Sequence, residues 1–175
     1  MKTTKSKKSK TQNSAKISYI LAMVFLVFGI IGWQAYNFAS SNVREQLSEQ
    51  KIFFPPQGKA LDPTTYPDLQ KYAGQQVDSG TKAKAYADGY IKKHLAKIAD
   101  GKTYSEVSSE FLKNPKDTKL AEQRQSLFMG TTLRGLLLNA YAFGVMANIL
   151  KVVSIISFVV GGLILASIVT RKKSA

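Results

Sequence analysis

His94 is the only histidine in the chain and the first residue to consider for catalysis or metal binding. On a helical wheel over residues 80–99 it falls on the apolar face with Ala83, Ala87, Tyr90, Ile91, Leu95 and Ile98. No carboxylate or second imidazole lies within one turn, so a metal site would need ligands from distant segments. We therefore expect His94 to bond to a backbone carbonyl or to line the core of its domain, and we predict no metal site.

Other catalytic residue patterns are also missing from the sequence. Because there is no cysteine, disulfides, thiolate metal sites, CxxC redox chemistry and cysteine nucleophiles are excluded. The sequence contains no nucleophile elbow, P-loop, HExxH motif or dinucleotide fingerprint. Glu106 and Glu110 share a helix face, but acid–base catalysis would require a cleft that perturbs their pKa values. The chain is predicted to be neither an enzyme nor a cofactor-binding protein.

Two apolar segments must position everything else. From Val152 to Thr170 there are 19 residues without a charge, close to the length that crosses the ~30 Å hydrocarbon core of a bilayer. A second uncharged segment covers residues 17–41. We predict transmembrane helices over 17–39 and 148–170, and the side chains expected at the membrane interfaces are Lys16, Trp33, Tyr36, Lys151 and Arg171. For the first segment, the alternative is a secretory signal that is cleaved near Ala39.

The positive charge of the chain is concentrated at its two ends. The net charge is +14, yet all 11 Asp and Glu lie between the two apolar segments. This positive-inside pattern predicts a two-pass protein of the bacterial cytoplasmic (inner) membrane. Its basic tails, 1–16 and 171–175, would be cytoplasmic, the first of them disordered, and residues 40–147 would form an extracytoplasmic domain. Lysine-rich tails favour the lipid bilayer as partner over nucleic acid, whose readout would favour arginine.

The predicted fold class is mainly α, an integral membrane protein whose two transmembrane helices form a hairpin that flanks a small helical domain. The second span should continue a long helix, because nothing just before Lys151 could form a loop. From Leu127 to Asn148 this helix is apolar on every side, so it needs a partner. That partner is either the protein's own domain with the outer end of the first span, or another subunit. The other subunit would be a second copy or a different membrane protein, with Arg134, Gly135, Asn139 and Gly144 as candidate contacts.

Glycines occur at similar depths in the two predicted spans. Gly29 and Gly32 lie in the first, and Gly161 and Gly162 lie in the second. Small residues allow helices to approach closely, so we predict that the spans pack near these glycines as an antiparallel hairpin. The alternative is that glycine is simply common in membrane helices.

Local signals divide the segment between the spans. Residues 80–99 form the best amphipathic helix, which should stop at Asp100-Gly101. A capping-box pattern at Thr103 predicts a short helix that ends near Phe111. Asn114-Pro115 then offers an N-cap and a first-turn proline for the long helix. Residues 57–79 should form an ordered loop with one helical turn near 68–72.

Two functional hypotheses follow from these features. The first is a structural or interaction protein, acting as an accessory or assembly factor through the apolar helix over 127–148. The second is a membrane-tethered sensor or binding module in which Tyr90, His94 and Arg134 line a pocket for a small molecule.

Two stretches resemble a group of small bacterial two-pass membrane proteins of unknown function. They are AYADGYIKKHLAKIADGKTYSEVS over 85–108 and SLFMGTTLRGLLLNAYAFGVMA over 126–147. Their most distinctive parts are the H-x(8)-TYxE spacing that starts at His94 and the LRGxLLNAYAFG run over 133–144. The resemblance implies membrane residence and an extracytoplasmic helical domain. Such proteins often carry the label of aromatic ring-opening dioxygenase, but one histidine does not supply the ligands that the iron of such an enzyme requires.

Overall fold

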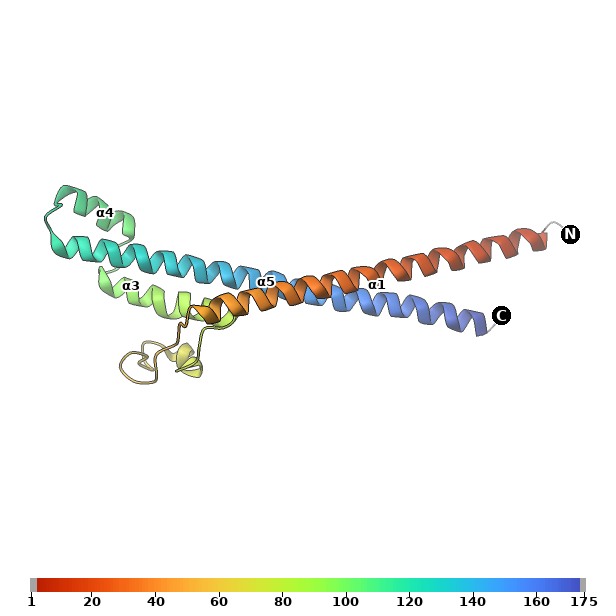
Figure 1. Ribbon diagram of the computed structural model, residues 1–175, viewed down its shortest axis with the longest axis horizontal. Coiled ribbons are helices and arrows are strands. Elements are labelled where there is room, and N and C mark those ends of the chain that lie inside the picture. Colours follow the sequence, from red (N-terminus) through yellow and green to blue (C-terminus); the bar gives the residue numbers. More distant parts are fainter. Residues whose placement is uncertain (1–2, 174–175) are drawn as a thin grey trace. The chain divides into compact units, whose positions relative to one another are not determined.

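The computed structural model describes residues 3–173, with side chains from Lys16 to Arg171. It is 79 % helical, and no strand occurs among those residues (Figure 1). The helical elements in chain order are α1 (Thr3–Glu49), the 3-10 helix η1 (Pro67–Tyr72), α2 (Gly80–Lys84), the π-helix η2 (Ala85–Ile91), α3 (Lys92–Ile98), α4 (Tyr104–Lys113) and α5 (Thr118–Lys173). The predicted mainly α fold class is confirmed, and α5 is the single long helix expected through Lys151.

Helices α1 and α5 each contain a segment that is long and apolar enough to cross a membrane. These segments are Lys16–Glu49 and Thr118–Arg171. Only 11 % of the most apolar window of α1 and 17 % of that of α5 are buried, whereas the core helix of a soluble protein is mostly buried. Both helices therefore present apolar surface that water does not solvate well.

Contacts divide the chain into two units. The first contains α1 up to Phe38 and α5 from Met146, and the second spans residues 39–145. Within the first unit α1 and α5 lie side by side and antiparallel, with the Thr3 end of α1 and the Lys173 end of α5 at the same end (Figure 1).

The N-terminal tail differs from the expectation of disorder, because the α1 backbone is helical from Thr3 onward. A helix that already exists over the span supplies the nucleus, so extending it into the tail requires no new nucleation. Lysine and alanine are also compatible with helix.

The main core of the second unit gathers side chains from α1, the loop that contains η1, α2, η2 and α5. Its buried residues are Leu47, Phe54, Leu61, Tyr66, Leu69, Val77, Ala83, Ala87, Ile91 and Leu137. The loop between α1 and α2 is tied down by backbone bonds in which Phe54 N donates to Gln75 O at 2.9 Å and Val77 N donates to Ile52 O at 2.8 Å. As predicted, this loop is ordered and contains one short helical turn, η1.

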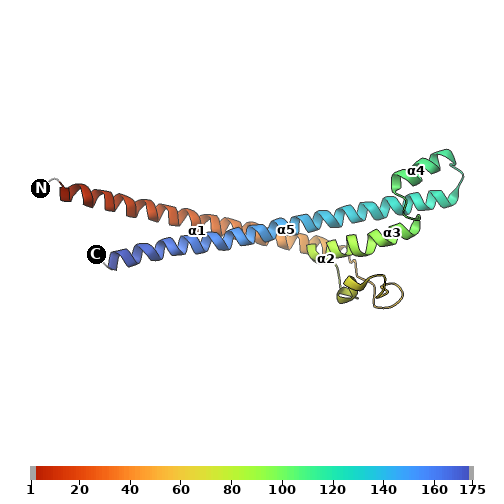
Figure 2. The ribbon, with the colours of Figure 1, turned by 180° about the vertical axis from the view of Figure 1, so that it is seen from behind.

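Helix α2 begins close to the backbone of α5 (Figure 2). Ser79 caps it by accepting a bond from Lys82 N. A Cβ added at Gly80 would lie 3.2 Å from both Ala140 O and Tyr141 Cα, and one at Gly144 would lie 3.4 Å from Gly80 Cα. Two glycines thus allow α2 and α5 to touch through their backbones.

The π-helix η2 corrects the predicted orientation of His94. Along Gly80–Ile98 the inward-facing positions recur every four residues, at Ala83, Ala87, Ile91 and Leu95. In an ideal α-helix each four-residue step advances the side chain by about 40°, so such a stripe would turn away from the core. The i→i+5 bonds of η2, such as Lys92 N to Ala87 O, underwind the helix and cancel this drift. His94, which the α-helical wheel placed on the apolar face, is therefore exposed.

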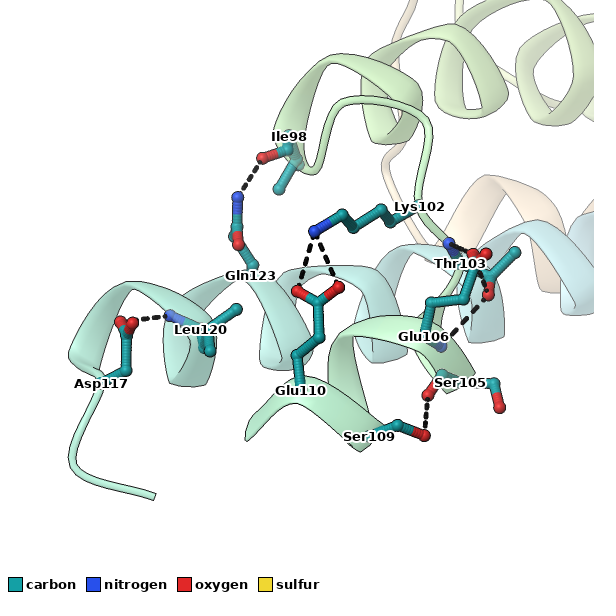
Figure 3. Close-up of polar contacts among 10 residues, drawn as sticks. All are labelled: Ile98, Lys102, Thr103, Ser105, Glu106, Ser109, Glu110, Asp117, Leu120 and Gln123. Carbon is teal, nitrogen blue, oxygen red and sulfur yellow. Dashed lines mark hydrogen bonds and ion pairs between the residues drawn. The ribbon is translucent and has the colours of Figure 1, made fainter. Parts of the chain in front are cut away.

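The turns that lead into α4 and α5 follow one prediction and correct another. The capping box is confirmed, since Glu106 N donates to Thr103 Oγ1 at 3.3 Å and Thr103 N donates to Glu106 Oε2 at 2.7 Å (Figure 3).

The predicted N-cap of the long helix at Asn114-Pro115 is wrong. Asn114 ends α4, and Asp117 caps α5 by accepting from Leu120 N at 3.0 Å. A carboxylate beside the first turn favours that start because of the helix dipole.

Candidate functional site

Tyr90 and His94 lie one turn apart at the end of a row of aromatic side chains. Their rings are stacked, with centroids 6.1 Å apart and planes 7° apart. The row continues through Tyr86 to Phe54, each step having a centroid distance of 5.1 Å. Burial raises the pKa of Tyr86 and of Tyr90, so both phenols stay neutral at physiological pH. The row packs the domain, and its exposed end is His94.

Arg134 contacts the π-helix rather than His94. Its Nη2 donates to Asp88 Oδ1 at 2.7 Å, and the two side chains are 32 % and 39 % exposed. An ion pair this exposed contributes on the order of 1 kcal/mol or less. The Nε atom of Arg134 is buried and has no hydrogen-bond partner among the described residues. The pair therefore connects α5 to η2 but contributes little to the stability of the fold.

Helix α5 packs only one of its sides on the domain. Leu137 lies in the core and Gly130 lies against Leu95. Away from this packed side, Met129, Leu136, Asn139 and Phe143 are exposed, and we call these four residues the open face. Leu136 is 61 % exposed and Phe143 is 58 % exposed. The spacing of seven, three and four residues places them on one line along the helix, as in the seam of a coiled coil.

Gly29 and Gly32 of α1 lie against α5 within the first unit. A methyl group at Gly29 would lie 2.7 Å from the ring of Phe158, and one at Gly32 would lie 3.4 Å from Ser154 Cβ. The hydroxyl of Ser154, which is fully buried, donates to the carbonyl oxygen of Gly29. Such a bond between membrane helices contributes about 0.6 kcal/mol on average.

Gly161 and Gly162 of α5 differ from each other. A methyl group at Gly161 would lie 3.1 Å from Leu26, whereas one at Gly162 would have no neighbour within 4 Å. Of the residues predicted at the membrane interfaces, Lys151 and Tyr36 are in contact, with Lys151 Nζ 5.3 Å from the centre of the Tyr36 ring. Tyr36 also packs against Trp33 with ring centroids 5.6 Å apart. Lys16 and Arg171 are exposed.

A cavity of about 500 Å³ lies between α4 and the first turns of α5. It is lined by Tyr104, Phe111, Ala121, Arg124, Gln125 and Phe128. None of Tyr90, His94 and Arg134 lines it. Figure 3 shows two polar contacts near it: Lys102 pairs with Glu110 at 2.8 Å, and Gln123 Nε2 donates to Ile98 O at 2.8 Å.

Comparison with known proteins adds no assignment. The chain matches no protein-family model, no curated protein and no solved structure. Between residues 16 and 171, no group of three or more His, Asp or Glu side chains is placed to hold a metal ion.

Sequence reasoning missed three residues that the structure brings into contact with others. Nothing in the sequence links Asp88 to Arg134, because the two residues are 46 positions apart. Ser154 carries a signal that could have been used, because a serine inside an apolar span must find an acceptor. Arg124 lies over the ring of Phe111 at 4.6 Å, a contact that depends on how α4 folds back onto α5.

Proposed function

We propose that this is a two-pass protein of the bacterial cytoplasmic (inner) membrane that acts as a structural or interaction protein. Both basic termini would be cytoplasmic, and residues 40–147 would form an extracytoplasmic domain. We propose no enzymatic activity, because the chain has one histidine and no cysteine.

The open face of α5 is the observation that supports this function. Its four residues are uncharged, and its apolar members are more than half exposed. Exposed apolar side chains at heptad spacing are typical of a helix that pairs with another helix. Asn139 at the centre would add a hydrogen bond between the two helices. The partner would be a second copy of this chain or a different membrane protein.

Cysteine crosslinking in native membranes tests this proposal without interference, because the chain has no cysteine of its own. A Leu136→Cys variant coupled to benzophenone maleimide should give an adduct on illumination, because the benzophenone inserts into C–H bonds of whichever chain lies beside it. An adduct of twice the 19.3 kDa chain would identify a second copy, and any other mass would identify a different protein. The control is Ser105→Cys, an exposed polar position of α4. Equal crosslinking of both variants, or none at Leu136→Cys, would refute the interaction.

The orientation is tested with a membrane-impermeant maleimide on intact cells. Lys59→Cys lies in the exposed loop before η1 and should react from outside. A cysteine at Ser9 should react only after lysis. Labelling of the Ser9 position in intact cells, or of Lys59→Cys only after lysis, would overturn the proposed topology. The crosslinking result would not be affected.

A further inference from the structure

The α4–α5 cavity has the size and composition of a small-molecule site. Its volume of about 500 Å³ falls in the range of about 300–1,000 Å³ that ligand pockets occupy. Tyr104 and Phe111 are seven residues apart on one face of α4, and Arg124 and Phe128 are four residues apart on one face of α5. At one end of the cavity the Tyr104 and Phe128 rings are 5.7 Å apart.

The charge in the cavity comes from Arg124 alone. Its guanidinium lies over the Phe111 ring at 4.6 Å, and it takes part in none of the ion pairs between residues 16 and 171. A guanidinium whose face lies over an aromatic ring keeps the N–H groups at its own edge available, where they can bind a carboxylate with two parallel hydrogen bonds. The chemistry of the lining is therefore complementary to an anion with an apolar body.

We propose that the α4–α5 cavity binds a small apolar acid, a molecule with one carboxylate and a flat or chain-like hydrocarbon body. The carboxylate would bind the guanidinium of Arg124. The hydrocarbon body would lie between the rings of Tyr104, Phe111 and Phe128. This site is separate from the open face of α5 and does not depend on a protein partner.

Calorimetric titration of the full chain in nanodiscs with 1-naphthoate tests the proposal, with empty nanodiscs as the reference for uptake by lipid. The neutral analogue 1-naphthalenemethanol has nearly the same shape but lacks the negative charge. We expect the acid to bind at least about tenfold more tightly than the alcohol. A hydrogen bond to a charged group contributes enough binding free energy for that difference or a larger one. No heat beyond the empty discs, or equal affinity for acid and alcohol, would overturn the proposal.

Variants locate the binding on Arg124. Arg124→Gln should lower the affinity for 1-naphthoate about tenfold or more, and Arg124→Lys should give an intermediate value because lysine keeps the charge but not the paired donors. The matched control Arg44→Gln removes an exposed arginine of α1 and should leave the affinity unchanged. The far-ultraviolet circular dichroism of each variant should match that of the parent. If folded Arg124→Gln binds as tightly as the parent, the carboxylate is not held there and the proposal fails.

Discussion

Replacing Gly80 by alanine tests the close approach of α2 and α5. The new Cβ would lie 3.2 Å from Ala140 O and from Tyr141 Cα. Both are backbone atoms, so helix α5 itself would have to shift by a few tenths of an ångström. Overpacking of this kind destabilises the fold by about 1–3 kcal/mol. The substitution also lowers the conformational entropy of the unfolded chain, which stabilises the fold by about 0.4–1 kcal/mol. The net expectation is a destabilisation of about 1 kcal/mol.

Gly135→Ala is the matched control, since it makes the same substitution in a helix of the same unit. A Cβ there would meet nothing within 4 Å. Only the helix propensity changes, and this favours alanine by about 0.5–1 kcal/mol. The two glycine-to-alanine variants should therefore shift the stability of the second unit in opposite directions.

Thermal unfolding in detergent, followed by circular dichroism in the tyrosine band, measures both effects. Of the eight tyrosines all but Tyr19 and Tyr36 lie in the second unit, so this signal reports on it. For a domain of about 100 residues, 1 kcal/mol corresponds to about 4–8 °C in Tm. Gly80→Ala should lower Tm by about that amount, and Gly135→Ala should raise it by roughly 2–8 °C. A rise of Tm in both variants would show that the two backbones do not touch.

Three further outcomes are expected, each measured by hydrogen exchange of the intact protein. Ser154→Ala should speed exchange around residue 154, because the bond to Gly29 that contributes about 0.6 kcal/mol is lost; unchanged exchange would contradict this contact. Thr103→Ala should destabilise the start of α4 by about 1 kcal/mol, whereas Thr103→Ser, which keeps the hydroxyl, should not. The pKa of Asp62 is lowered to about 2 because the Thr64 hydroxyl and the Thr65 amide donate to its carboxylate, so protection of the Thr65 amide should persist above about pH 4 and disappear as the pH falls through about 2. In Asp62→Asn that pH step should be absent.

The sequence predicts the helices well because the signals that define them are local. Apolar runs identify the long segments of α1 and α5, and the side-chain pattern at Thr103 and Glu106 marks the start of α4. Asp100 and Gly101, which follow α3, have φ of 50° and 84°, the left-handed conformations expected of a helix stop. Each of these signals lies within a few residues of the feature that it predicts.

What the sequence does not reveal depends on distant contacts. The orientation of His94 follows from η2, whose i→i+5 bonds an α-helical wheel does not represent. The cavity requires α4 to fold back along α5, so Phe111 and Arg124 could not be paired in advance. Asn114-Pro115 and Asp117 both offer N-caps, and only the turn in which Asp117 N donates to Asn114 O decides between them.

The π-helix η2 also has a consequence for how this chain tolerates changes of length. A one-residue deletion inside an ordinary helix rotates everything downstream by about 100°, which would turn buried side chains into solvent. Within Ala85–Ile91 the same deletion would remove the surplus residue and leave a regular α-helix, so Leu95 and the turns beyond it could keep their contacts. Related chains that are one residue shorter are therefore expected to carry their gap at this position.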